Sequence, residues 1–169
     1  MSATTDQEDG DEVPVLPALL YHYTTVQAAR SIVRDGRIRA AEQTLHRDMF
    51  ARDAGRLVGP HVWFTENPLG EATTGAKQRA AGYRGDFVGH MARVAVRFDG
   101  VESYSLEEYA ARTATSWEDW MWVVRTTEMA GGDWEIWRLA AADVPSAAFA
   151  AVEVMTGIDA VGTSWGPLA

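Results

Sequence analysis

The segment Leu20-Tyr21-His22-Tyr23-Thr24 places a histidine between two tyrosines near the start of the apolar part of the chain. A neutral imidazole carries one hydrogen-bond donor and one acceptor, so it can hold a sugar hydroxyl in a defined orientation. Aromatic neighbours suit the floor of a cleft that binds a ribose and an aromatic ring. The alternative is a buried histidine whose ring is satisfied by backbone groups, as buried polar atoms usually are. From the sequence, both interpretations of His22 stay open.

Several other catalytic templates are missing from the sequence. The chain has no cysteine, which excludes disulfides, thiolate zinc sites and a thiol nucleophile. Neither a glycine-rich phosphate loop nor a Gly-x-Ser-x-Gly elbow occurs. The four histidines show no paired metal-ligand spacing; they are His22, His46, His61 and His90. We therefore expect no metal cofactor.

A helix is expected directly after the His22 segment. Thr24, with Gln27 three residues later, has the form of a capping box. Apolar residues then recur at helical spacing before a glycine that suits the left-handed position after the last turn. These residues are Val26, Ala29, Ile32, Val33 and Gly36. Thr24 thus has a structural explanation as the residue that caps this helix.

Short strands and helices alternate irregularly along the rest of the chain. In residues 61–65, alternation places Val62 and Phe64 on one face and Trp63 on the other. Further strands are expected over residues 19–23, 91–98, 134–139 and 149–155, with helices over 69–81, over 105–112 and from Ser116 onward. This pattern predicts an α+β fold with split sheets rather than a regular βαβ repeat.

Seven tryptophans are a high number for a chain of 169 residues. Because Trp combines a large apolar ring with an N–H that needs a partner, several of these rings are expected to line a groove or interface as well as the core. A stripe at helical spacing predicts the core-facing side of the helix after Ser116: Trp117, Trp120, Met121 and Val124. Trp122 lies off this stripe, which favours a groove or partner contact for it.

The net charge is −9, and the first twelve residues supply −5 of it without any Lys or Arg. We expect residues 1–16 to form an acidic disordered tail and residues 17–169 to form a single domain. The negative charge disfavours bulk binding to nucleic acid, which requires clustered positive charge. No signal peptide or membrane-spanning run is visible, so we expect a cytoplasmic protein without membrane contact.

Three blocks follow one another in a characteristic order. The first is Tyr-His-Tyr-Thr with the helix that ends in glycine, the second is Val-Trp-Phe-Thr at residues 62–65, and the third is an acid that opens a strand near residue 135. In this order they resemble the ADP-ribosyltransferase superfamily of the His-Tyr-Glu kind, with bacterial or phage toxin-like and DNA-modifying members most similar. The resemblance covers roughly residues 19–155. It implies an ADP-ribosyltransferase-like split β-sheet that holds NAD⁺ as a substrate in the cleft between its halves.

The resemblance also implies roles for individual residues. His22 would hydrogen-bond a ribose hydroxyl of NAD⁺, with Tyr23 and Thr24 at the edge of the cleft. Trp63 or Phe64 would stack on the nicotinamide ring. Many relatives use a tyrosine in the second block, and its absence here leaves stacking possible but removes a hydroxyl contact.

The third block would supply a carboxylate. Breaking the glycosidic bond of NAD⁺ develops positive charge on the ribose, which a nearby carboxylate stabilises. Glu135 is the candidate because it follows a Gly-Gly-Asp loop and opens a predicted strand; the rivals are Glu66, Asp133 and Glu102. The NAD⁺ pyrophosphate needs cationic donors, for which the candidates are Arg52, Arg56, Arg93 and Arg97.

The function implied is that of an NAD⁺-dependent mono-ADP-ribosyltransferase, a glycosyltransferase, or an NAD⁺ glycohydrolase acting with an unidentified macromolecular or nucleotide acceptor. One alternative is an enzyme that transfers a 2′-phosphate from RNA, and another is an inactive binding module with the same fold. If the first hypothesis is correct, His22, Trp63 and Glu135 should converge on one cleft.

Overall fold

The computed structural model describes residues 17–41, 59–68, 88–129, 132–158 and 163–169. The predicted tail, the predicted helix over 69–81 and the candidate Arg52 lie outside these residues. In the described part, no helix is both long and apolar enough to cross a bilayer.

Seven strands form a single sheet in which every described pair is antiparallel. Its order is β5 (Tyr104–Ser105), β6 (Trp137–Ala140), β3 (Val62–Thr65), β1 (Leu19–Thr25), β4 (Met91–Arg97), β8 (Phe149–Ile158) and β9 (Thr163–Pro167). A second, two-stranded sheet pairs β2 (Arg37–Ile38) with β7 (Val144–Pro145). The α+β class that the sequence predicted is confirmed.

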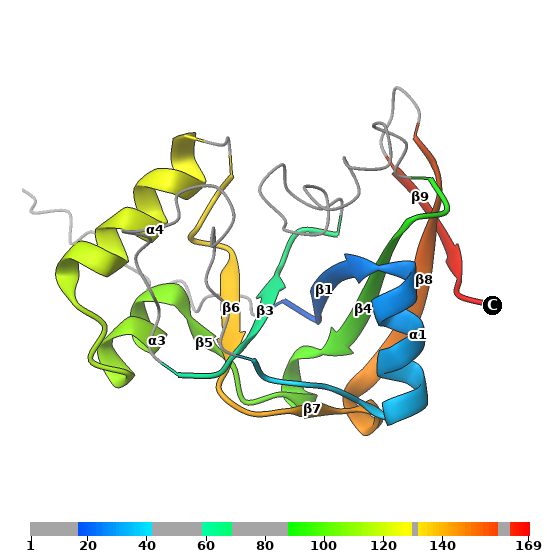
Figure 1. The fold of residues 1–169 in the computed structure, drawn as a ribbon, viewed down its shortest axis with the longest axis horizontal. Coiled ribbons are helices and arrows are strands. Elements are labelled where there is room, and N and C mark those ends of the chain that lie inside the picture. The colour runs from blue at the N-terminus through cyan, green and yellow to red at the C-terminus, as the bar shows by residue number, and fades with distance from the viewer. Residues whose placement is uncertain (1–16, 42–58, 69–87, 130–131, 159–162) are drawn as a thin grey trace, which may run out of the picture.

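The described residues include three helices, and they cover different halves of the sheet. α3 (Leu106–Arg112) and α4 (Trp117–Met129) lie at the β5–β6 end, whereas α1 (Val26–Asp35) lies beside β4 and β8 (Figure 1). Two 3₁₀ turns, Phe98–Gly100 and Ser146–Ala148, follow β4 and β7. The predicted strand over 91–98 therefore ends at Arg97.

Strand β1 lies at the centre of the sheet and pairs unequally with its two neighbours. Its register with β4 runs along its whole length, from Leu19–Arg97 to Thr25–Met91. Its described register with β3 is the single pair Tyr21–Thr65. Beyond that pair, β1 continues along β4 while β3 continues along β6. We call the point where the two strands separate the β1–β3 fork.

The start of α1 differs from the prediction by one residue. The N-cap is Thr25, whose backbone is extended and whose hydroxyl accepts a hydrogen bond from the Ala28 N–H at 3.2 Å. Thr24 still belongs to the strand, where it is buried opposite Ala92. The Thr24 capping box was therefore wrong, because pairing with β4 extends β1 through both threonines. At the other end, Gly36 adopts the left-handed conformation as predicted, with φ of 67°.

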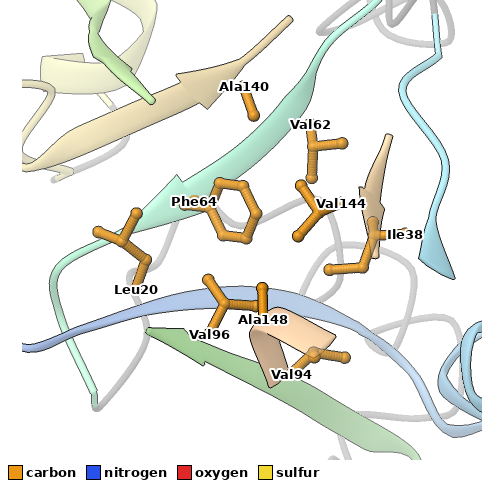
Figure 2. Packing of buried hydrophobic residues seen from close by; sticks show 9 residues of the cluster. All are labelled: Leu20, Ile38, Val62, Phe64, Val94, Val96, Ala140, Val144 and Ala148. Atoms are coloured by element: carbon orange, nitrogen blue, oxygen red, sulfur yellow. The ribbon is translucent and has the colours of Figure 1, made fainter. Parts of the chain in front are cut away.

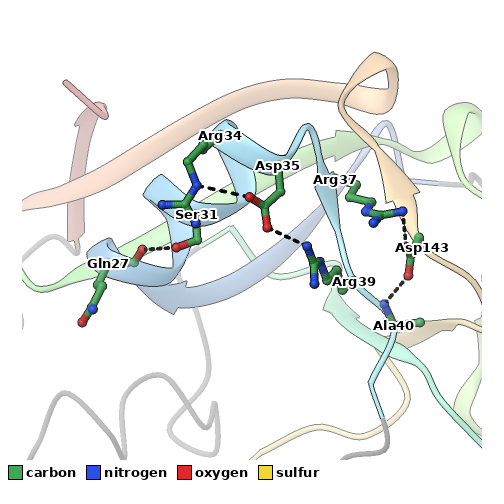
Figure 3. A network of polar contacts seen from close by, with 8 residues as sticks. All are labelled: Gln27, Ser31, Arg34, Asp35, Arg37, Arg39, Ala40 and Asp143. Carbon is green, nitrogen blue, oxygen red and sulfur yellow. Dashed lines mark hydrogen bonds and ion pairs between the residues drawn. The ribbon is translucent and has the colours of Figure 1, made fainter.

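The corner after α1 is tied down by exposed ion pairs (Figure 3). Asp35 accepts hydrogen bonds from Arg34 at 3.2 Å and Arg39 at 3.0 Å. Asp143 pairs with Arg37 at 3.1 Å and accepts the Ala40 N–H at 2.9 Å. Each exposed pair contributes at most about 1 kcal/mol. The Asp143 contacts join the β2 segment to the residue that precedes β7.

The helices α3 and α4 begin at the predicted caps. Ser105 and Glu108 form a reciprocal capping box, and the Ser116 hydroxyl accepts the Asp119 N–H at 3.1 Å. The predicted core stripe of α4 was wrong in part, because the most exposed of its residues is Trp117, with 72% of its surface accessible.

The side of α4 that packs inward is set by its neighbours. Val123 is fully buried against residues of α3 and β6. Trp122, for which the sequence favoured a groove or partner contact, packs against the same cluster. The cluster comprises Leu106, Tyr109, Val123 and Leu139.

The main core lies between β3 on one side and β1 with β4 on the other (Figure 2). Val62 and Phe64 point into it, as the alternation in residues 61–65 predicted. Leu20, Val94 and Val96 meet them from the opposite side. Each large apolar side chain buried here contributes about 1.5–3 kcal/mol. This core therefore holds together the two parts of the sheet that separate at the fork.

Candidate functional site

His22 lies at the β1–β3 fork and is half-buried. Its Nδ1 is 2.9 Å from the backbone carbonyl oxygen of Trp63 on β3. A carbonyl oxygen can only accept, so Nδ1 must carry the proton and donate it. This contact fixes the ring tautomer and makes Nε2 the acceptor nitrogen of the neutral imidazole. An acceptor held in this way is suited to bind a hydroxyl group.

Phe64 lies on the same side of the sheet as His22. The two ring centroids are 6.0 Å apart in an edge-on arrangement. Only 3% of the surface of Phe64 is exposed, and the ring belongs to the main core. A ligand could not stack on Phe64 without displacing core side chains, so the residue supports the His22 ring instead.

The side chain of Trp63 points to the other face of β3, because successive side chains of a strand alternate. It packs edge-on against Trp137 at 5.0 Å and against His61 at 5.4 Å. Its indole Nε1 is buried, and it has no hydrogen-bond partner in the described structure. His22 and Trp63 are therefore linked through the Trp63 carbonyl, and their side chains do not converge on one side of the sheet.

Tyr23 and Thr24 are both buried. The Tyr23 hydroxyl donates to the Asn67 carbonyl at 3.0 Å, and burial raises the pKa of Tyr23 above its ordinary value of 10. The Asn67 N–H in turn donates to the Thr65 hydroxyl at 3.1 Å. Tyr23 thus anchors the segment that leaves β3, and it remains a neutral donor at physiological pH.

Glu135 does not open a strand. Residues 134–136 form a turn, and β6 begins at Trp137, the residue that pairs with the last residue of β3, Thr65. The predicted strand start was wrong because pairing with β3 determines where β6 begins. Glu135 is exposed, and its N–H donates to the Asp133 carboxylate at 3.0 Å.

A second acid, Glu66, directly follows β3. Its carboxylate pairs with the Arg138 guanidinium at 2.8 Å, and both side chains are largely buried. Its N–H donates to the Ile136 carbonyl at 3.0 Å, which places Glu66 beside the turn that holds Glu135. From the sequence, Glu66 was only a rival to Glu135 as the catalytic acid. Nothing in the residues around Glu66 indicates that Arg138 pairs with it.

Arg93 was a candidate for binding the NAD⁺ pyrophosphate, but its guanidinium is engaged within the protein. It pairs with Glu153 at 2.7 Å and donates to the Pro68 carbonyl. It also lies over the rings of Tyr21 and Trp165, at 4.9 Å and 4.4 Å from their centroids. Strand alternation in the sequence predicted that Arg93 lies outside the main core. Its contacts with β8 and β9 could not be predicted, because those strands are distant in the sequence.

His61 is the histidine that the structure buries completely. Its Nδ1 donates to the Gly59 carbonyl at 2.9 Å, and its ring packs edge-on against Tyr109. Burial lowers the pKa of His61 below its ordinary value of 6.5, so the ring is neutral at pH 7. His61 Nε2 is also buried, and it has no hydrogen-bond partner in the described structure. Both His22 and His61 therefore have Nδ1 bonded to a backbone carbonyl, as the alternative interpretation of His22 expected.

Comparison with models of known protein families finds no match. Comparison with curated protein sequences also finds none.

Proposed function

We propose that this protein is an NAD⁺-dependent mono-ADP-ribosyltransferase or NAD⁺ glycohydrolase in which His22 positions the ribose. The observation that carries the proposal is the hydrogen bond from His22 Nδ1 to the Trp63 carbonyl at the β1–β3 fork. It fixes the tautomer of a half-buried ring, so that Nε2 has the acceptor character that a contact with a ribose hydroxyl requires. The α+β fold and the first two sequence blocks support the same proposal.

In the proposed reaction, the bond between the ribose C1′ and the nicotinamide nitrogen breaks. Nicotinamide leaves as a neutral molecule with the electron pair of that bond, and positive charge develops on the ribose. A nucleophile then attacks C1′ and releases its proton, which gives ADP-ribosylated acceptor or, with water, free ADP-ribose. A hydroxyl held by His22 would keep the ribose in place during this change.

Two acids could stabilise the positive ribose. Glu66 is the better oriented, because Arg138 holds its carboxylate at 2.8 Å. Glu135 is the one that the family resemblance implies, and its exposed position leaves it accessible to a substrate. Because the Glu66 N–H bonds to the carbonyl of Ile136, both acids lie at the same end of the β3–β6 pair.

RNA 2′-phosphate transfer would call for basic groups that are not already paired. The two largely buried arginines of the sheet, Arg93 and Arg138, are each paired with a glutamate. This arrangement disfavours 2′-phosphate transfer, and it also means that the pyrophosphate of NAD⁺ would have to be bound by groups other than these two arginines.

The proposal is tested by incubating the protein with NAD⁺ and measuring nicotinamide release by chromatography. The acceptors supplied are water, a protein mixture and free nucleotides. His22→Ala should lower the release rate about 100-fold, because the ribose is no longer held in place, whereas His90→Ala, at an exposed turn, should not change it. The proposal fails if no acceptor gives release and calorimetry detects no NAD⁺ binding.

A further inference from the structure

Two tryptophans of α4 and one from the turn before β6 are in contact. Trp117 and Trp120 are stacked, with centroids 5.4 Å apart and 12° between the ring planes. Trp120 meets Trp134 edge-on, also at 5.4 Å. Trp134 packs inward against the buried cluster of Leu106, Tyr109, Val123 and Leu139, so the three rings run from the core to the surface. We call them the tryptophan ladder.

The outermost ring of the ladder is unusually exposed. Trp117 has 72% of its surface accessible, the highest value among the exposed large apolar residues of the described structure. A tryptophan normally buries about 150–250 Å² on folding, and Trp117 leaves most of its surface in contact with water instead. The stacking on Trp120 holds the ring in one orientation, which leaves its outer face presented to solvent.

The segment that carries the ladder is strongly acidic. Residues 116–135 contain five acids and one base: Glu118, Asp119, Glu128, Asp133, Glu135 and Arg125. Two of the acids form hydrogen bonds with residues of this same segment. Glu128 accepts the Trp134 indole N–H at 3.3 Å, and Asp119 accepts the Ser116 hydroxyl at 2.8 Å.

We propose that the tryptophan ladder is a docking surface for an arginine-rich segment of a partner protein. A guanidinium stacks on the face of an exposed indole, and the surrounding carboxylates attract its charge. This proposal concerns binding alone and does not depend on the proposed activity.

The charges of the described segment argue against two other occupants. A second copy of this chain would bring the same acidic segment to a twofold interface, where like charges repel. The phosphates of a nucleic acid would meet the same repulsion. A cationic peptide is the occupant for which both the aromatic ring and the carboxylates are favourable.

The test uses the full-length protein and a fluorescein-labelled peptide of alternating Gly and Arg, with binding measured by fluorescence anisotropy. Peptides with Lys or Glu in place of Arg serve as probes of specificity. We expect the Arg peptide to bind most tightly, because Arg stacks on indole better than Lys does. Trp117→Ala should weaken its binding about fivefold, and Glu118→Gln should weaken it about twofold and reduce its salt dependence.

Matched variants separate docking from general attraction to an acidic protein. Val33→Ala removes an exposed apolar side chain from α1, and Glu107→Gln removes an exposed charge from α3, so neither should change binding. Because Trp117 is mostly exposed, its variant should fold, which circular dichroism checks.

Three results would overturn the proposal. The first is binding by Trp117→Ala equal to that of the unchanged protein, and the second is equal binding of the Glu peptide. The third is self-association, measured by sedimentation, that Trp117→Ala abolishes, because this result assigns the surface to a second copy.

Discussion

The bond between His22 and the Trp63 carbonyl predicts that the structural and functional roles of His22 can be separated. In His22→Asn, the side-chain NH₂ lies close to the position of Nδ1 and can still donate to the carbonyl oxygen 2.9 Å from the native nitrogen. It has nothing at the position of Nε2. His22→Ala removes both nitrogens and the ring contact with Phe64.

The expected losses follow from these contacts. A hydrogen bond between neutral groups contributes about 1 kcal/mol net, and loss of the ring packing against Phe64 costs about another 1 kcal/mol. His22→Ala should therefore lower the free energy of unfolding by about 2 kcal/mol. With a urea dependence of about 2 kcal/mol per molar, the unfolding midpoint should fall by about 1 M. His22→Asn should recover about half of this loss.

The assay combines urea unfolding with nicotinamide release from NAD⁺. We expect His22→Asn to regain stability without regaining activity, because the ribose-binding nitrogen is still missing. The reasoning about Nε2 is refuted if His22→Asn releases nicotinamide as fast as the unchanged protein. The reasoning about the Trp63 carbonyl is refuted if His22→Asn is no more stable than His22→Ala.

Three further predictions concern the elements around the fork. Thr25→Ala should lower the free energy of unfolding by about 1 kcal/mol, measured by urea unfolding, while Thr25→Ser restores it; equal stability of all three proteins would contradict the cap. Burial lowers the pKa of His61, so the unfolded chain binds more protons and stability should fall as the pH drops below about 6.5. The urea midpoint of the unchanged protein should therefore be lower at pH 5.5 than at pH 7.5, and this difference should be smaller in His61→Gln. An equal difference in the two proteins would count against a buried neutral ring. Glu66→Gln should reduce nicotinamide release about 100-fold and more than Glu135→Gln does, whereas the reverse order would make Glu135 the acid.

The sequence was most informative where a feature depends on near neighbours. The left-handed glycine at residue 36 and the serine caps at residues 105 and 116 follow from local backbone chemistry, and all three were predicted at the right positions. The alternation of Val62, Trp63 and Phe64 was also predicted correctly, because a strand has a period of two residues.

Features that depend on distant partners could not be predicted from the same patterns. The sequence favours Thr24 as the cap because Gln27 follows three residues later, whereas pairing with β4 keeps Thr24 in the strand and moves the cap to Thr25. The exposure of Trp117 and the inward packing of Trp122 depend on where α3 and β6 meet α4. Ion pairs such as Glu66–Arg138 join residues far apart in the chain and leave no local signal.

The predicted convergence on one cleft is wrong for His22 and Trp63, because their side chains lie on opposite faces of the sheet. What links His22 to the turn that holds Glu135 is the backbone of β3. Its Trp63 carbonyl accepts from His22, and the residue after the strand, Glu66, donates to the carbonyl that follows Glu135. Because β3 has only four residues, a shift of the strand would move the His22 contact and the acidic turn together. The geometry of any site at the fork therefore depends on the main core, which holds β3 against β1 and β4 through Phe64 and Val62.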